Sequence, residues 1–256
     1  MKSKIGKFIF ATGGYVLYLL SGVLAALFLY LFQLVEKLFE KGSVGSFAES
    51  FGEISEKDSS LVLVISYALV LIVSFLLLKF QRKDVRSYTG ILSVYPLGIF
   101  GAVVFGAILN FITFSIVAPI HTDETEMTFL LLVCLFLGPF VEEFVFRGIL
   151  LRMYGKVLGV AGAILMTSLL FAISHTGITQ MIYAFVLGIV LCMVRIRSKS
   201  LWNAVALHMS FNLSGTVLAT SELELPDIAF AVLPVLIVLS FILACSGGRK
   251  ALVRRK

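Results

Sequence analysis

The sequence predicts an all-α, polytopic membrane protein with about eight transmembrane helices. Hydrophobic residues make up 59% of its 256 positions, and charged residues only 14%. A soluble domain of this length needs far more polar surface, so the excess apolar residues are expected to face lipid. They occur in runs of roughly 20, the number that crosses ~30 Å of hydrocarbon as a helix. We expect a single membrane domain over residues 1–256, because no linker divides the chain.

Eight spans follow from the hydropathy. They are predicted near residues 8–32, 61–80, 92–118, 127–151, 158–177, 178–195, 202–220 and 228–246. The first begins after three lysines, as a signal peptide would, but its apolar run from Phe8 to Val35 is too long for one. We therefore expect a retained anchor. The polar segment 33–60 is compatible with a short interfacial helix or with a solvated loop.

Basic clusters alternate with basic-poor loops along the chain. Lys and Arg gather at the N-terminus, after the second, fourth and sixth spans, and in the C-terminal tail. Residues 119–126 and 221–227 contain acidic residues and no Lys or Arg. The positive-inside bias then predicts a multi-pass protein of the cell membrane with both termini cytoplasmic. The net charge of +6 is divided among these clusters, so we expect membrane lipid, and no nucleic acid, as a partner.

Ionisable residues inside the predicted spans are the main functional signal, because each costs at least ~2.5–3.5 kcal/mol at mid-bilayer. The fourth span contains Glu142, Glu143 and Arg147. Glu143 and Arg147 are four residues apart on one helix face and can form an ion pair. Glu142 points about 100° away, free to titrate or to hold a water. Pro139 removes a backbone hydrogen bond and should kink the helix just before the acids.

Two other spans supply histidine. The fifth ends with Phe171 and His175, and the seventh contains His208 and Asn212; each pair is four residues apart and shares a helix face. A lone histidine or a Glu–Arg pair in a membrane helix is about as often structural as functional. Here a carboxylate, two histidines and an amide occur on three spans. That set includes a general base, a second proton carrier and oxyanion donors, which favours a catalytic site.

The three motifs resemble those of the CAAX protease and bacteriocin-processing family of intramembrane proteases, also called CPBP or Abi. The family pattern is Glu-Glu-x-x-x-Arg, then Phe-x-x-x-His, then His-x-x-x-Asn, and no motif position departs from it here. The resemblance covers a core of about residues 127–220 and is nearest to the bacterial branch. It implies an eight-helix CAAX-type endopeptidase, a hydrolase whose substrate is a peptide or a membrane-anchored protein.

The resemblance also implies a role for each motif residue. Glu142 and His175 would activate the attacking water, and His208 and Asn212 would stabilise the oxyanion of the tetrahedral intermediate. Three further residues would support these groups: Glu143, Arg147 and Phe171.

The sequence leaves open whether the site binds zinc, and it allows two functions other than hydrolysis. Glu142, His175 and His208 could ligate zinc. The chain lacks the His-Glu-x-x-His spacing, and zinc would leave Asn212 without a role, so metal-free hydrolysis is favoured. A proton-coupled transporter could use the same buried groups, but no related halves with broken helices are visible. A non-catalytic membrane scaffold or bacteriocin immunity protein could keep the motifs as structural contacts.

Overall fold

The computed structural model describes residues 4–39, 59–80, 89–116, 133–220 and 227–247, and the regular elements in these ranges are all helical. The elements are α1 (Lys4–Phe39), α3 (Ser59–Phe80), α5 (Pro96–Ile116), η1 (Val133–Leu137), α7 (Gly138–Glu143), η2 (Phe144–Leu150), α8 (Leu151–Ile173), α9 (Ile178–Ser198), α10 (Leu201–Thr220) and α11 (Asp227–Ala244). The predicted all-α class is confirmed. Most of the segment 33–60, with its possible interfacial helix, lies outside the described residues.

Several helices are suited to cross a membrane. The stretches long and apolar enough are Lys4–Leu31, Leu61–Lys79, Pro96–Thr113, Val133–Ile173 and Ile178–Ser198. Large apolar side chains project from their outer faces; Ile9, Phe75 and Phe100 are each more than half exposed. Such surfaces are stable only against hydrocarbon, so the chain is a multi-pass membrane protein. The count of eight spans stays a prediction, because α10 and α11 are not among these five.

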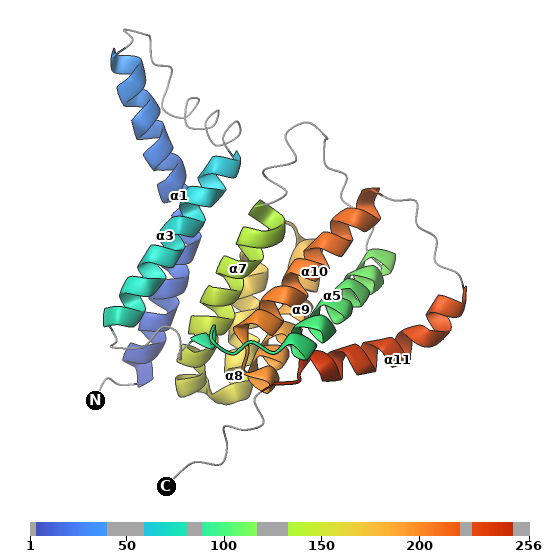
Figure 1. The fold of residues 1–256 in the computed structure, drawn as a ribbon. Coiled ribbons are helices and arrows are strands. Elements are labelled where there is room, and N and C mark those ends of the chain that lie inside the picture. The colour runs from blue at the N-terminus through green and yellow to red at the C-terminus, as the bar shows by residue number, and fades with distance from the viewer. Residues whose placement is uncertain (1–3, 40–58, 81–88, 117–132, 221–226, 248–256) are drawn as a thin grey trace.

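The stretch Val133–Ile173 reverses direction at Gly159, whose φ of 73° lies in the left-handed region that glycine tolerates. A Cβ built at Gly155 would lie 4.0 Å from the Cβ of Ala163. Eight residues of straight helix would separate these positions by about 12 Å. The chain therefore turns back, and α8 ends beside the elements that carry the acids (Figure 1). This reversal falls at the predicted boundary between the fourth and fifth spans.

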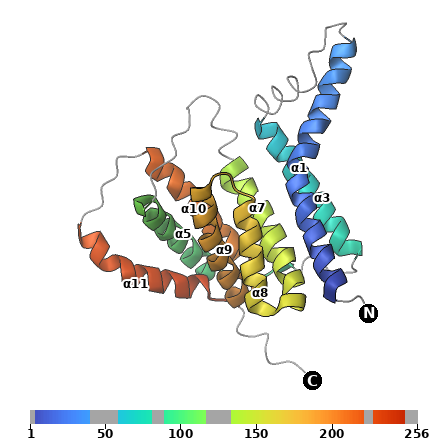
Figure 2. The ribbon, with the colours of Figure 1, turned by 180° about the vertical axis from the view of Figure 1, so that it is seen from behind.

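The helices form two groups joined by the elements that carry the motifs (Figures 1 and 2). On one side α1 and α3 pack against each other, and α1 also contacts α8. On the other side α5 packs against α10 and α11. One apolar core joins α1, η2, α8 and α9, and a second joins α5, α9, α10 and α11. The elements η1, α7 and η2 lie between the two groups, with α7 in contact with both α3 and α10.

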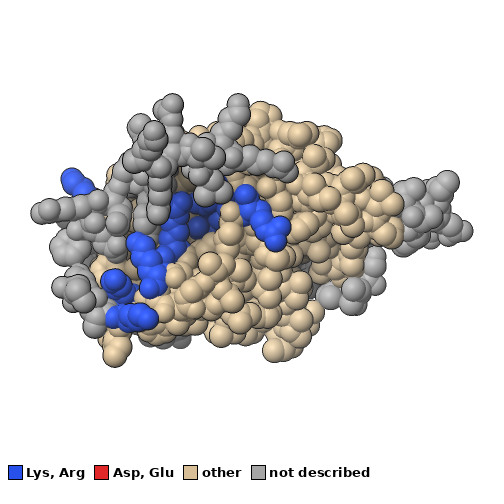
Figure 3. Space-filling view, turned by 90° about the horizontal axis from the view of Figure 1, so that it is seen from below, with Lys and Arg blue, Asp and Glu red and all other residues tan. Residues whose placement is uncertain are grey.

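Exposed basic side chains gather at one end of the bundle. They are Lys4, Lys7, Lys79, Arg152, Lys156, Arg197 and Lys199. They lie near the start of α1, the end of α3, the end of α9 and just before Gly159, which share the lower end of the bundle in Figure 1. Figure 3 views this end, where Lys and Arg gather and no described Asp or Glu is visible. The described part of the fold thus has the charge asymmetry on which the predicted orientation rests.

Candidate active site

The two acids lie where the helix changes its winding. Glu142 and Glu143 end the short α-helical segment α7, which is flanked by the π-helical segments η1 and η2. Pro139 lies in the first turn of α7, directly after η1. The disruption expected from this proline is therefore a change of helical type one turn before the acids. π-Helical turns occur frequently at functional sites, because they re-aim the side chains that follow.

Glu143 is the centre of a buried polar cluster. Its Oε1 accepts a hydrogen bond of 2.8 Å from Arg147 Nη1 and one of 3.0 Å from His208 Nδ1. Glu143 and Arg147 are fully buried, and His208 is only 3% exposed. Arg147 also donates to the Gly188 carbonyl of α9 at 3.4 Å. The ion pair predicted from spacing is present. The contact to His208, from a helix 65 residues further on, was not predicted.

Among the described side chains, no cationic group makes a direct hydrogen bond to Glu142. Its carboxylate is 16% exposed, and its Oε2 lies 3.9 Å from His208 Nε2. That distance is too long for a direct hydrogen bond. An oxygen atom placed about 2.8 Å from both atoms would bond to each of them. The gap between Glu142 and His208 therefore matches what a bridging water or a reacting oxygen requires.

The Phe171 ring is a shared surface for the charged and imidazole groups. Its centroid lies 4.6 Å from that of His175, 5.6 Å from that of His208, and 4.3 Å from Arg147 Cζ. The last contact is a cation–π interaction, and both ring pairs are edge-to-face. His175 Nδ1 also donates to the Phe171 carbonyl at 2.7 Å. The neutral His175 ring then keeps Nε2 as an acceptor, as a proton carrier requires.

Asn212 has a less central place. It lies one turn from His208 on α10, and its Nδ2 donates to the Cys134 carbonyl of η1 at 3.4 Å. A side-chain amide has two N–H donors, so one remains for a ligand. Six of the seven sequence-predicted residues are thus linked by the contacts above, and Asn212 joins them through its helix and η1.

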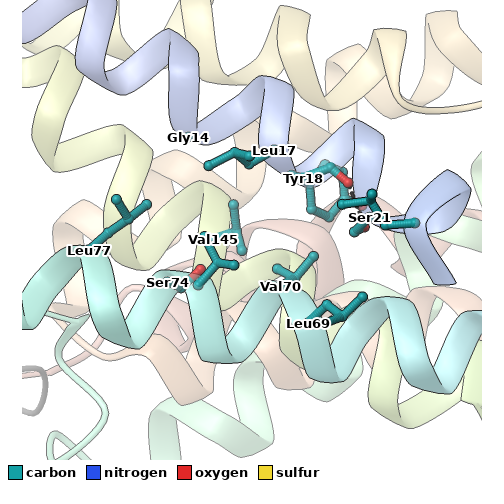
Figure 4. A pocket seen from close by; sticks show the side chains of 11 residues that line it. Gly14, Leu17, Tyr18, Ser21, Leu69, Val70, Ser74, Leu77 and Val145 are labelled. Atoms are coloured by element: carbon teal, nitrogen blue, oxygen red, sulfur yellow. Dashed lines mark hydrogen bonds between the residues drawn. The ribbon is translucent and has the colours of Figure 1, made fainter. Parts of the chain in front are cut away.

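Two tyrosines from outside the motifs also reach the site. Tyr18 of α1 and Tyr67 of α3 interact electrostatically with Glu142. Tyr18 also lines an apolar pocket between α1 and α3, which Val145 of η2 closes from behind (Figure 4). Motif analysis missed both tyrosines, since a tyrosine in an apolar span resembles ordinary packing. Their only signal was a hydroxyl group that needs a partner away from the membrane interface.

The donor types of Glu142, His175 and His208 are compatible with zinc, since each histidine keeps Nε2 available while Nδ1 bonds to an acceptor. Among the described residues, however, no three His, Cys, Asp or Glu side chains are grouped closely enough to hold a metal ion.

Residues 124–214 match the sequence model of the family described as Type II CAAX prenyl endopeptidase Rce1-like. All three motifs lie inside this range. The motif-bearing part of the chain is thus similar to the Rce1-like family. The resemblance predicted from the sequence is thus confirmed. The match starts after α5 and ends within α10, leaving out α1, α3, α5 and α11. No curated protein and no solved structure matches the chain. This match supports a CAAX-type intramembrane endopeptidase that acts on a peptide or protein.

Proposed function

We propose that this protein hydrolyses a peptide bond inside the membrane, with Glu142 as the general base. The observation that carries the proposal is the contrast between the two adjacent acids. Glu143 is bonded to Arg147 and His208, whereas Glu142 faces His208 Nε2 across 3.9 Å with no bonded partner between them. One acid is therefore structural, and the other is free to take a proton from water.

The reaction begins with a water held by the Glu142 carboxylate. Glu142 takes a proton from this water, and the resulting hydroxide attacks the peptide carbonyl carbon. His175 assists, because its Nε2 accepts a hydrogen bond from the same water or relays the proton. The proton then moves to the leaving nitrogen as the C–N bond breaks. The products are a new carboxylate and a new amine, so the atoms of one water balance the reaction.

His208 and Asn212 stabilise the oxyanion of the tetrahedral intermediate. His208 Nδ1 donates to the Glu143 carboxylate, while Nε2 lies towards Glu142. When both ring nitrogens carry hydrogen, Nε2 donates to the oxyanion. The free N–H of Asn212 is the second donor. One fixed donor of this kind lowers the barrier by about 3–4 kcal/mol.

The family name indicates the first substrate to try, a prenylated peptide with a C-terminal CAAX sequence. Protein reconstituted in lipid vesicles should release the C-terminal tripeptide of a farnesylated CAAX peptide, detected by mass spectrometry. In ¹⁸O-labelled water, one ¹⁸O should enter the new carboxylate of the prenylated product. A folded wild-type protein that releases no tripeptide would contradict a CAAX peptidase and favour a scaffold, an immunity protein or a transporter.

We further propose that the basic end of the bundle faces the cytoplasm, with both termini on that side, in a bacterial cell membrane. The exposed basic side chains at this end and the basic-poor loops 119–126 and 221–227 support this orientation. A cysteine at Lys199, which is exposed at the end of α9, should resist a membrane-impermeant thiol reagent in intact cells. One at Asp123 should react. The reverse pattern overturns the orientation.

A further inference from the structure

Two tyrosines bracket Glu142 along one side of its helix. Gly138, Glu142 and Phe146 follow one another at four-residue intervals and form a stripe about one turn apart. At one end, a Cβ built on Gly138 would lie 2.9 Å from the Tyr67 hydroxyl. At the other end, the Tyr18 ring packs edge-on against Phe146 with centroids 5.3 Å apart. The catalytic carboxylate thus lies between the two phenols.

The hydroxyl groups of this pair face the site. Tyr18 and Tyr67 interact electrostatically with Glu142 and with each other. The Tyr18 hydroxyl also lies close to the side chain of Ser174. Ser174 in turn donates to the Phe171 carbonyl, which also accepts from His175. Tyr18 therefore brings α1 close to the turn that carries His175.

Tyrosine in a membrane helix is most simply an interface anchor. Tyr18 lies about 21 Å along α1 from Lys4, well away from a headgroup region at that end. Tyr67 is likewise inside α3, eight residues after Ser59. Both side chains are partly buried against the core that contains Val141, Val145 and Phe146. A phenol in this position needs a polar partner, and the Glu142 carboxylate supplies one.

We propose that Tyr18 and Tyr67 are positioning residues whose hydroxyl groups donate hydrogen bonds to the Glu142 carboxylate and to the water it holds. The α1/α3 pair, outside the family match, thereby completes the site on the side that the motifs leave open. The expected effect of the tyrosines on turnover rests on the proposed function. Their hydrogen bonds to Glu142 do not depend on that function, so they are measured without a substrate.

The substrate-free test is infrared difference spectroscopy of the protein in lipid vesicles. At a pH low enough to protonate Glu142, the carboxyl C=O band that disappears in Glu142→Gln identifies Glu142. Loss of a hydrogen-bond donor raises the frequency of such a band, so Tyr18→Phe and Tyr67→Phe should each shift it upward. Tyr15→Phe is the matched control, since Tyr15 also packs on Phe146 but donates to the Leu170 carbonyl. It should leave the band unchanged.

The kinetic test uses release of tripeptide from the farnesylated CAAX peptide. Each Tyr→Phe change at position 18 or 67 should lower kcat roughly tenfold or more with little change in KM, because the lost bonds hold water and base rather than substrate. Tyr15→Phe should retain kcat per folded molecule. If a Phe variant accumulates poorly, 3-fluorotyrosine at the same position keeps the ring, makes the hydroxyl a stronger donor, and should lower the band frequency.

The outcomes separate the two proposals. If the Tyr18→Phe and Tyr67→Phe variants shift the band but the wild type cleaves no peptide, the tyrosine network stands and the proposed function is overturned. Cleavage with an unshifted band and an unchanged kcat in both Phe variants would overturn the role of the tyrosines alone.

Discussion

Two regions of the molecule contribute different kinds of side chain to the site. The first comprises the motif-bearing elements from η1 to α10, and the second is the α1/α3 pair. In the first region, charged groups are buried and bonded to one another, as Glu143, Arg147 and His208 are. Away from its charged ends, the second region is apolar apart from a few hydroxyl groups, and those of Tyr18 and Tyr67 lie near the site. Buried charged residues are easy to recognise in a sequence, because ionisable residues are rare inside membrane spans. Hydroxyl groups that complete a site from another helix are hard to recognise.

Unpairing the buried charges of the motif-bearing region should have the largest effect on the protein. Glu143→Ala leaves Arg147 fully buried without its carboxylate, and Arg147→Ala leaves Glu143 without its cation. Each change should lower the free energy of unfolding by about 3–5 kcal/mol and reduce accumulation in the membrane. Unfolding of the purified protein in detergent measures the loss.

Arg197→Ala is the control for the charge-unpairing variants, since Arg197 is exposed at the end of α9. It should change the stability by no more than about 0.5 kcal/mol. A Glu143→Ala variant as stable as Arg197→Ala would show that the buried pair does not hold this region together.

The helices and most of the site residues could be predicted from the sequence, but several contacts between helices could not. Hydropathy predicted most helix ends to within about four residues, because the length of a span is set by the bilayer. Two ends were misplaced: α1 continues to Phe39 instead of ending near residue 32, and the fourth span continues to Gly159 instead of ending near residue 151. The Glu143–Arg147 pair followed from spacing, since both residues lie on one helix. The bond from His208 to Glu143 and the two tyrosines join different helices, and their approach depends on tertiary packing that a single sequence does not reveal.

Helix α5, which lies outside the range matched by the family model, packs against the helix that carries His208 and should help to position it. A side chain at Gly106 of α5 would collide with the Leu207 carbonyl oxygen, which precedes His208 on α10. Gly106→Ala should therefore cost about 1–3 kcal/mol of stability. It should also lower kcat roughly tenfold to hundredfold, because displacement of a catalytic group by ~1 Å costs that much.

Gly13→Ala is the matched control for Gly106→Ala, since nothing lies within 4 Å of a Cβ added there. Unfolding and tripeptide release should both resemble those of the wild type. A Gly106→Ala protein with normal kcat per folded molecule would remove α5 from the parts of the fold that set the geometry of the site.

The smallest expected effect is that of metal removal. Purified protein should contain less than stoichiometric zinc by plasma mass spectrometry, and strong chelators should leave tripeptide release intact. Stoichiometric zinc that is lost in His175→Ala, together with activity restored by adding zinc to stripped protein, would instead assign Glu142, His175 and His208 to a metal site.

The most direct measurement is release of tripeptide by Glu142→Gln at a matched amount of folded protein in the same vesicles. Glutamine keeps the shape of the side chain but cannot accept the proton from water. Because Glu142 has no bonded cationic partner, the variant should accumulate like the wild type. Its kcat should fall by at least about 10²-fold, the typical contribution of a general base. Full activity in folded Glu142→Gln would contradict glutamate-based hydrolysis at this site.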